Sequence, residues 1–399
     1  MAQRSLGIVG AGQLAQMLVQ AAQKQSNSAK ISVLAGSLAE PAVLAGAEGF
    51  VGKFQDPELL KKFFSSNERI IFENEFFPAE FESVAAQLKP DHEKTQYFVP
   101  ALKTLKLLRN KLLQKILLKN LNIDSSPFLL WGNVEPKDYL NECEAQFGKN
   151  FVLKWALGGY DGKGVLLPSK IKEAPEFLKK AEAAGYPVYA EAKIDFKSEW
   201  AVIACRSLSG EMSFFPFVES TQRNGICFEV QGSSVEPVEL EAAFAQIRSW
   251  ITKLADHINL VGSFGVELFL DRSNKFWVNE LAPRVHNSGH YTQDAFHQDQ
   301  FEFHLKAALG EKLSTPREKY PFWGMFNLLG PDGASGSATL PTHNKASSTF
   351  LHWYSKKEIR AGRKMGHLNW VATTKAEAVE VREEALKWIQ DWERTVANG

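Results

Sequence analysis

Residues 266–290 read VELFLDRSNKFWVNELAPRVHNSGH, and this stretch decides the fold that we predict. Two segments rich in apolar residues, 266–271 and 275–280, flank Arg272-Ser273-Asn274, which is a natural connection for a β-hairpin. A two-residue turn at Ser273-Asn274 would place Glu267 directly opposite Glu280. The hairpin therefore brings two carboxylates face to face.

Facing carboxylates repel each other unless a cation lies between them. Oxygen-only ligands suit Mg²⁺, which takes one or two carboxylates together with phosphate oxygens. The pair therefore predicts a magnesium site at Glu267 and Glu280. Asn279 is expected to point to the opposite face unless the strand ends there. The alternative is a solvent-exposed pair in a slipped register.

Two further polar segments suit anions. The loop after the hairpin carries Arg284, His286, Asn287 and His290, and an arginine fork binds a planar anion such as bicarbonate well. Upstream, Lys154 precedes GGYDGKG at 158–164, a strand-loop-strand whose backbone N–H groups can close over phosphates. It is not a Walker loop, because no helix is expected to begin after it. The alternatives are a surface loop held by its own side chains and a flexible hairpin tip.

Strands and helices alternate through the N-terminal part of the chain, which predicts a doubly wound parallel sheet. GAGQLA at 10–15 lies between a strand and a helix and fits the G-x-G-x-x-A pattern that brings an anion to a helix N-terminus. The second strand ends at Ala35-Gly36-Ser37, without the carboxylate that an NAD site needs. We expect a phosphate-bearing ligand or a purely structural turn. The expected strands are 5–10, 31–36 and 69–72, and the expected helices are 13–24, 57–64 and 78–88.

Beyond this sheet, the apolar residues of 100–122 recur at helical spacing and predict one helix. The C-terminal part carries KKEIRAGRKMGH at 356–367, which concentrates basic residues in an otherwise neutral protein. One phosphate monoester would suffice as its partner, and the patch is too short for a nucleic-acid surface. The alternative is a solvated basic loop. Further strands are expected at 151–156, 164–167, 188–194, 200–206 and 212–219, with helices at 173–184, 237–258 and 376–396.

Composition is that of an ordinary globular protein. The 399 residues exceed one typical core, so two to four domains are expected. Lys+Arg and Asp+Glu are balanced at 46 each, which argues against a polyanion-binding or membrane-surface protein. Cys143, Cys205 and Cys227 lack metal-ligand spacing and read as free thiols. With no long apolar run, we expect a cytoplasmic protein.

Taken in order, these motifs resemble the 5-(carboxyamino)imidazole ribonucleotide synthase family. The matching stretches are GAGQLAQML at 10–18, IIFENE at 70–75, GGYDGKG at 158–164, residues 266–290, FNLLG at 326–330 and GRKMGH at 362–367. The resemblance implies an α/β ATP-grasp fold. Its parts would be an N-terminal doubly wound pre-ATP-grasp domain (1–95), linker helices and a lid subdomain (96–186), an antiparallel-sheet catalytic domain with the metal site (187–316) and a small C-terminal domain (317–399).

The resemblance also implies the chemistry and the residues that perform it. The family uses MgATP to convert bicarbonate to carboxyphosphate, and transfers the carboxylate to the exocyclic amine of 5-aminoimidazole ribonucleotide in purine biosynthesis. ADP and phosphate are the other products, and the enzyme is usually a homodimer. On the matching positions, Mg²⁺ would be held by Glu267 and Glu280. ATP would be held by Lys111, Lys154, Gly158, Gly159, Gly162, Lys163, Gly164, Glu191, Glu199, Gln222 and Asn279. The catalytic residues would be Arg284, His286, Asn287, Tyr160 and Asp161. The ribonucleotide would be held by Gly12, Gln13, Leu14, Glu73, Lys357, Arg363 and Lys364, with Lys356 as the alternative to Lys357.

Some positions depart from the family pattern. Ala15-Gln16 stands where Gly-Arg is usual, Gln222 where histidine is common, and Glu229 where arginine is expected. Ala156 and Leu157 occupy a stretch where basic residues are usual. These changes leave two alternatives open: a related ligase with another amine acceptor, and a non-catalytic nucleotide-binding descendant.

Overall fold

The computed structural model describes residues 4–24, 29–132, 134–158, 164–343 and 348–398. The N-terminal segment forms the expected parallel sheet, in the order β3-β2-β1-β4-β5. The side chain of Asp56 caps α3 by accepting the N–H groups of Glu58 and Leu59. The elements are β1 (Ser5–Val9), α1 (Gln13–Lys24), β2 (Lys30–Ala35), α2 (Pro41–Leu44), β3 (Glu48–Val51), α3 (Pro57–Ser65), β4 (Arg69–Phe72), α4 (Glu80–Leu88), α5 (His92–Thr95) and β5 (Phe98–Val99).

The glycine turn after β1 is shaped by the side chain of Glu73. Gly10 has a φ of +101°, and a Cβ there would lie 2.4 Å from the Glu73 carboxylate. A Cβ at Gly12 would come within 3.0 Å of the same group. The N–H of Ala15 points at Glu73 Oε2 at 3.3 Å. The first N–H groups of α1 therefore face a carboxyl group of the protein itself.

The single helix predicted for 100–122 is wrong, because the chain forms two helices there. They are α6 (Leu102–Leu108) and α7 (Lys111–Asn120). Between them Asn110 adopts an extended conformation, and its side chain accepts the N–H of Leu113 to cap α7. The break directs α7 toward the lid, which follows it in the chain.

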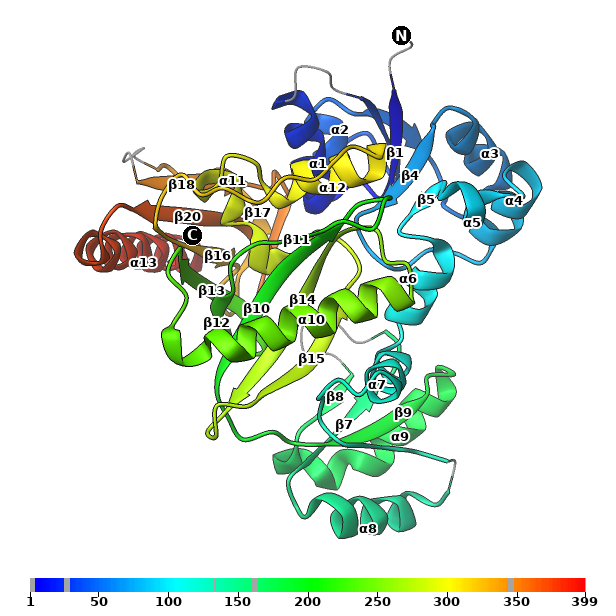
Figure 1. Cartoon of the computed structure of the whole chain (residues 1–399), viewed down its shortest axis with the longest axis vertical. Coiled ribbons are helices and arrows are strands. Elements are labelled where there is room, and N and C mark those ends of the chain that lie inside the picture. Colours follow the sequence, from blue (N-terminus) through cyan, green and yellow to red (C-terminus); the bar gives the residue numbers. More distant parts are fainter. Residues whose placement is uncertain (1–3, 25–28, 133, 159–163, 344–347, 399) are drawn as a thin grey trace.

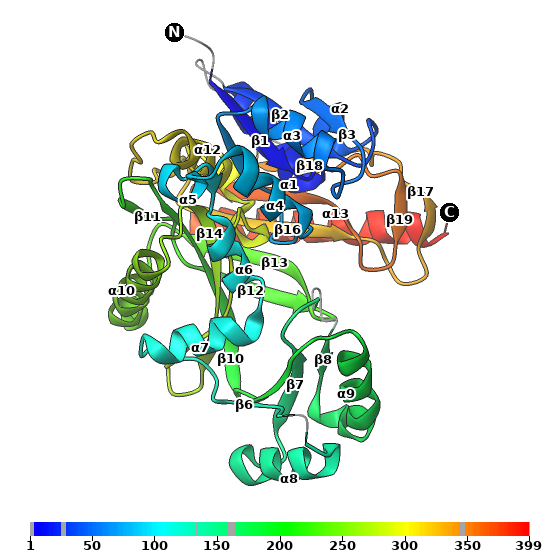
Figure 2. The same ribbon diagram turned by 90° about the vertical axis from the view of Figure 1, so that its right-hand side faces the viewer.

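The lid is a four-stranded sheet of order β6-β9-β7-β8, packed against two helices. Its core includes Tyr139, Cys143, Leu153 and Leu178, all fully buried. In Figures 1 and 2 it lies at the end of the molecule opposite the N-terminal sheet. Its elements are β6 (Phe128–Leu130), α8 (Pro136–Phe147), β7 (Phe151–Trp155), β8 (Val165–Leu166), η1 (Pro168–Glu173), α9 (Ala174–Ala183) and β9 (Val188–Ala192).

The third part is an antiparallel sheet of order β15-β14-β10-β12-β13-β16-β20-β18, with β11 paired to β10. The segment predicted as one strand, 212–219, divides into β11 and β12, and β13 was not predicted. Strands β16, β20 and β18 continue the same sheet, while the four domain boundaries stay a prediction. The elements are β10 (Phe196–Arg206), β11 (Met212–Phe214), β12 (Val218–Arg223), β13 (Ile226–Ser233), η2 (Val238–Leu240), α10 (Glu241–His257), β14 (Gly262–Asp271), β15 (Phe276–Ala282), η3 (Asn287–Gly289), α11 (Thr292–Ala295), α12 (Gln300–Leu309), β16 (Phe322–Leu329), β17 (Ser335–Ser337), β18 (Thr349–Trp353), β19 (Glu358–Arg360), β20 (Lys364–Ala372) and α13 (Lys375–Asn398).

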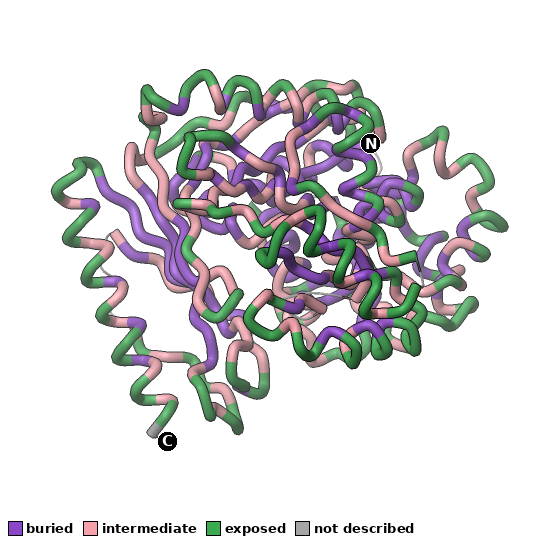
Figure 3. Tube along the Cα trace, turned by 90° about the horizontal axis from the view of Figure 1, so that it is seen from below, coloured by how far each residue is buried: buried purple, intermediate pink, exposed green. Residues whose placement is uncertain are grey.

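The two faces of this sheet have different partners. Helix α10 packs on one face through Phe244 and Ile251, and α13 covers the C-terminal strands on that same face through Ile389. Helix α12 packs on the other face through Phe303, next to the N-terminal domain (Figure 1). Figure 3 shows strands that are largely buried and outer helices that alternate between buried and exposed residues. In the described part of the chain, no helix is long and apolar enough to span a bilayer.

The glycine turn yields a first prediction. We expect Gly10→Ala to lower the free energy of unfolding by about 1 to 3 kcal/mol, because the added methyl group meets Glu73 and the backbone stays left-handed. Gly132→Ala is the control, since a Cβ there meets nothing within 4 Å. Chemical denaturation followed by circular dichroism measures both. Equal stability of the two variants would contradict the role given to Glu73.

Candidate active site

The hairpin of β14 and β15 brings the two predicted glutamates together. Glu267 pairs with Glu280 in the strand register, as predicted. The predicted two-residue turn is wrong, because Leu270 pairs with Phe276 and the N–H of Asp271 binds the carbonyl of Lys275. The connection therefore has three residues and ends at Asn274, whose φ of +65° is the left-handed conformation usual in such turns.

A bulge between the turn and the pair restores the predicted register. Leu268 pairs with Val278, while Glu267 pairs with Glu280, so Asn279 is the extra residue of β15. The prediction that Asn279 points to the opposite face is wrong for this reason. Its Nδ2 lies 3.4 Å from Glu267 Oε2, on the face that carries both carboxylates. The bulge thus gathers two carboxylates and one amide on a single face.

Lys111 closes this group from α7. Its Nζ lies 2.6 Å from Glu280 Oε2. Burial and the charge of Glu280 both raise the pKa of Glu267. Among the described residues, no cluster of three or more His, Cys, Asp and Glu side chains is arranged to hold a metal alone. Two carboxylates with room for phosphate oxygens suit Mg²⁺, which seldom has an all-protein cage.

A second charged cluster lies where α7 meets the lid. Glu191 on β9 contacts Lys154 on β7, and its Oε2 lies 3.0 Å from Lys115 Nζ and 3.0 Å from Ser126 Oγ. Burial alone would raise the pKa of Glu191, but the two ammonium groups outweigh it and lower the pKa to about 2. Glu191 therefore stays ionised and holds Lys154 in place. That Glu191 holds ATP stays a prediction.

The loop after β15 is fixed by long-range contacts. Arg284 Nε lies 2.9 Å from Glu75 Oε2, which joins the loop to the end of β4. His286 Nε2 lies 3.6 Å from Glu267 Oε1. Burial, and then the charges of Arg284 and Lys364, lower the pKa of His286 to about 3. The imidazole is neutral, and because its Nδ1 accepts the N–H of Ser288, its Nε2 carries the proton.

At the N-terminal domain, Glu73 and the turn 12–14 lie together as predicted. Burial raises the pKa of Glu73 to about 7, against the opposing effect of the N–H groups of Ala15 and Gly12. The C-terminal lysine that reaches this turn is Lys356. Its Nζ donates to Gln13 Oε1 and to the carbonyl of Lys364, whereas Lys357 is exposed.

Glu199 and Glu229 lie on opposite faces of the large sheet. Glu199 pairs with Ser220 and lies near Gln222, on the face that carries Glu267. Glu229 lies on the other face, where Arg382 of α13 binds both of its oxygens at 2.5 and 2.8 Å. Glu229, which stands where arginine is expected, therefore faces α13 and not the acidic pair.

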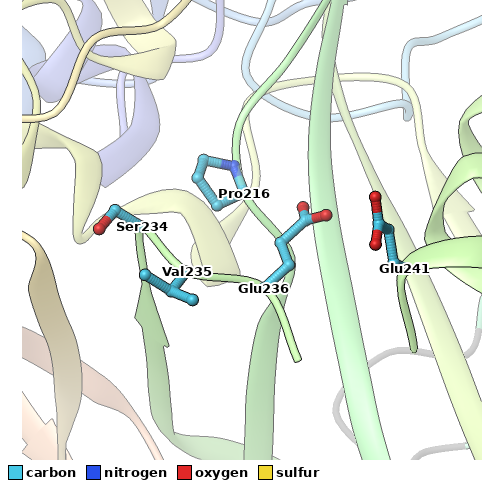
Figure 4. Close-up of a pocket in the computed structure, with 5 residues that line it drawn as sticks. All are labelled: Pro216, Ser234, Val235, Glu236 and Glu241. Carbon is cyan, nitrogen blue, oxygen red and sulfur yellow. The ribbon is translucent and has the colours of Figure 1, made fainter. Parts of the chain in front are cut away.

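Several predicted residues are not brought to the acidic pair. Gly159, Tyr160, Asp161, Gly162 and Lys163 lie outside the described residues. Arg363 donates to the carbonyl of Glu358. A cavity of about 410 Å³ lies elsewhere, lined by Pro216, Ser234, Val235, Glu236 and Glu241 (Figure 4).

Sequence reasoning gave no role to Lys115 or Glu75. Lys115 is fully buried one turn after Lys111, and this spacing on one helix was a usable signal. Glu75 stands two residues after Glu73, but nothing local indicates its pairing with Arg284. Cys227 was also given no role. Asn327 binds its carbonyl oxygen, and burial raises the pKa of its thiol against the opposing charge of Lys364.

Three domain families match the chain in succession. The ribonucleotide synthetase pre-ATP-grasp domain matches residues 3–106. The ATP-grasp domain matches residues 116–301, and the phosphoribosylaminoimidazole carboxylase C-terminal domain matches residues 324–381. Together they confirm the predicted fold class.

Relatives align over nearly the full length of the chain. The N5-carboxyaminoimidazole ribonucleotide synthase of Staphylococcus aureus (strain COL) is 32% identical over 366 residues, which cover 91% of each chain. That of Synechococcus elongatus is 34% identical over 369 residues, covering 91% of this chain and 88% of the relative. The crystal structure of the Aspergillus clavatus synthase with ADP and 5-aminoimidazole ribonucleotide has a TM-score of 0.81 at 26% identity, covering 97% of this chain and 99% of that one. The chain therefore belongs to the N5-carboxyaminoimidazole ribonucleotide synthase family of ATP-grasp enzymes.

Proposed function

We propose that this chain carboxylates the exocyclic amine of 5-aminoimidazole ribonucleotide, using ATP and bicarbonate, in purine biosynthesis. The observation that carries the proposal is the single face that joins Glu267, Asn279 and Glu280 to Lys111 and His286. Family membership gives the ligase activity. The resemblance also implies a homodimer in the cytoplasm, and both stay predictions.

Glu267 and Glu280 would hold Mg²⁺, which neutralises charge on the β- and γ-phosphates of ATP when bound. Lys111 would leave Glu280 for a phosphate oxygen as the cation takes its place. Lys154 is fixed by Glu191 and would contact the phosphates from the lid. The flap residues Gly158, Gly159, Gly162, Lys163 and Gly164 are proposed to close over the nucleotide.

Bicarbonate attacks the γ-phosphorus of ATP, and ADP leaves with the electron pair of the broken P–O bond. Arg284 would hold the planar anion and the carboxyphosphate that forms. The neutral His286 would donate from Nε2 to an oxygen of the same group. The amine then attacks the carboxyphosphate carbon, and the bond from this carbon to the bridging oxygen breaks. Phosphate leaves with the electron pair and takes up the proton that the amine loses. Asn287, Tyr160 and Asp161 are proposed to orient the two reactants.

The ribonucleotide would lie between the turn 12–14, Glu73 and the loop that carries Lys356. This arrangement supports Lys356 in place of Lys357 as the phosphate contact. Lys364 and Arg363 are proposed to complete the phosphate site. Glu199 and Gln222 are proposed to contact the nucleotide at the far end of the acidic face.

The proposed reaction predicts strict coupling between substrates. Purified protein should release ADP only when bicarbonate and 5-aminoimidazole ribonucleotide are both present. A coupled assay for ADP, run with each substrate omitted in turn, measures this. ADP release that ignores the ribonucleotide would exclude the proposed reaction, and turnover with a different amine would identify another acceptor.

The acidic pair predicts a metal-dependent loss of activity. We expect Glu280→Gln to lower kcat about 100-fold or more and to weaken the dependence of the rate on Mg²⁺ concentration, because one of two ligands is lost. Glu219→Gln is the matched control, since Glu219 lies on the opposite face of the sheet, with Phe244 and Ala378. Unchanged Mg²⁺ dependence in the Glu280 variant would remove the metal site from this pair.

Substitutions can show which of the neighbouring lysines, Lys356 or Lys357, contacts the phosphate. We expect Lys356→Ala to raise KM for the ribonucleotide about 10- to 100-fold, because a charged hydrogen bond to phosphate is lost. Lys357→Ala should leave KM within about twofold, since its side chain is exposed. Steady-state kinetics with varied ribonucleotide decides between them, and the reverse order of effects would restore Lys357 as the contact.

A further inference from the structure

The imidazole rings of His290, His367 and His352 form a row, the histidine stack, which begins at the proposed catalytic loop, and the chemistry above does not use it. The ring centroids of His290 and His367 are 4.8 Å apart, and their planes are tilted by 37°. Those of His367 and His352 are 4.4 Å apart, with planes within 8° of parallel. His290 and His367 are fully buried, and burial lowers the pKa of each well below its usual value. The rings of His290 and His367 are therefore neutral.

The middle ring makes two hydrogen bonds to different elements. His367 Nε2 lies 3.0 Å from Gln293 Oε1, and its Nδ1 lies 2.7 Å from the hydroxyl of Tyr354. Because an amide oxygen only accepts, Nε2 carries the proton and Nδ1 accepts from Tyr354. The ring thus joins α11 to the segment that follows β18.

The outer members add bonds between the same elements. Asp294 Oδ2 lies 2.7 Å from His352 Nε2 and accepts from Asn369 Nδ2 at 2.7 Å. Asn369 Nδ2 also donates to the carbonyl of His290 at 3.0 Å. Residues 290–294 are therefore bound to both β18 and β20. These shared hydrogen bonds hold the three segments together, although within the described residues Nε2 of His290 and Oδ1 of Asn369 have no hydrogen-bond partner.

At its other end the stack reaches the proposed catalytic loop. The side-chain amide of Gln300 accepts the N–H of His286 at 2.9 Å and donates to its carbonyl at 2.7 Å. The same amide nitrogen lies 3.2 Å from His290 Nδ1. A Cβ at Gly289 would lie 2.8 Å from this amide, so glycine permits the close approach. The backbone of His286 is held through Gln300 and His290.

The strand beyond His367 carries the proposed phosphate contacts. Lys364 begins β20, its carbonyl accepts from Lys356, and Lys356 follows two residues after Tyr354. We propose that His367 is a positioning residue, which holds the loop 284–290 at a fixed distance from Lys356 and Lys364 through the stack with His290 and the bond to Tyr354. The carboxyphosphate and the amine then meet before water intervenes. This inference rests on the proposed function.

His367→Phe tests the proposal, because it keeps a buried ring and removes both hydrogen bonds. We expect KM for the ribonucleotide to rise about tenfold and the ADP formed per carboxylated product to rise above the equimolar ratio. Tyr354→Phe, which removes only the hydroxyl group, should shift both quantities in the same direction by less. The matched control is His304→Phe. His304 is equally buried and accepts the N–H of Ser263 at 3.0 Å, outside the stack.

A purely structural role would lower the melting temperature of both histidine variants and leave the ADP-to-product ratio at one, and that result would overturn the proposal. Wild-type protein that forms no product would instead refute the proposed reaction. Hydrogen exchange then still decides the inference, because it needs no substrate. Amides of residues 284–290 should exchange faster in His367→Phe than in His304→Phe, and equal rates would refute the positioning role.

Discussion

Two carboxylates that face each other across β14 and β15 constrain the rest of the site. Two carboxylates paired across neighbouring strands repel each other and destabilise the fold unless a cation lies close to them. The chain supplies one from α7, where Lys111 Nζ lies 2.6 Å from Glu280. The hairpin is thereby coupled to the helix that leads into the lid. A divalent cation bound with a triphosphate would relieve the same repulsion and release the lysine toward the phosphates.

Bulges in three strands direct side chains to this face. Asn279 in β15 is turned toward Glu267. In β13 the extra residue is Phe228. Cys227, which precedes it, pairs with Gln222 on the face that carries the site. In β20 the register shifts at Met365, immediately after Lys364. An extra residue reverses the alternation of the strand, so a regular sheet would send these side chains away from the substrates.

The sequence pattern predicted an element correctly where the residues of that segment alone determine its structure. Helix α1 and strand β4 have the predicted bounds. The pairing of Glu267 with Glu280 was correct only because a longer turn and a bulge compensate each other. Asn110 shows a missed signal, since a capping residue inside an apolar pattern can divide a helix. Contacts such as Arg284 with Glu75 had no local signal, because they depend on how distant elements pack.

Two positions where the family usually has arginine show that a charge lost from the sequence is not always a charge lost from the active site. Glu229 faces α13 and is neutralised by Arg382 there. Gln16 is buried and donates to the carbonyl of Trp353, so α1 holds the loop after β18 through a neutral bond. That loop brings the ammonium group of Lys356 to Gln13. The ammonium group beside the start of α1 therefore belongs to this loop and not to the helix. Because Tyr354 ties the same loop to His367, the position of that charge depends on the histidine stack.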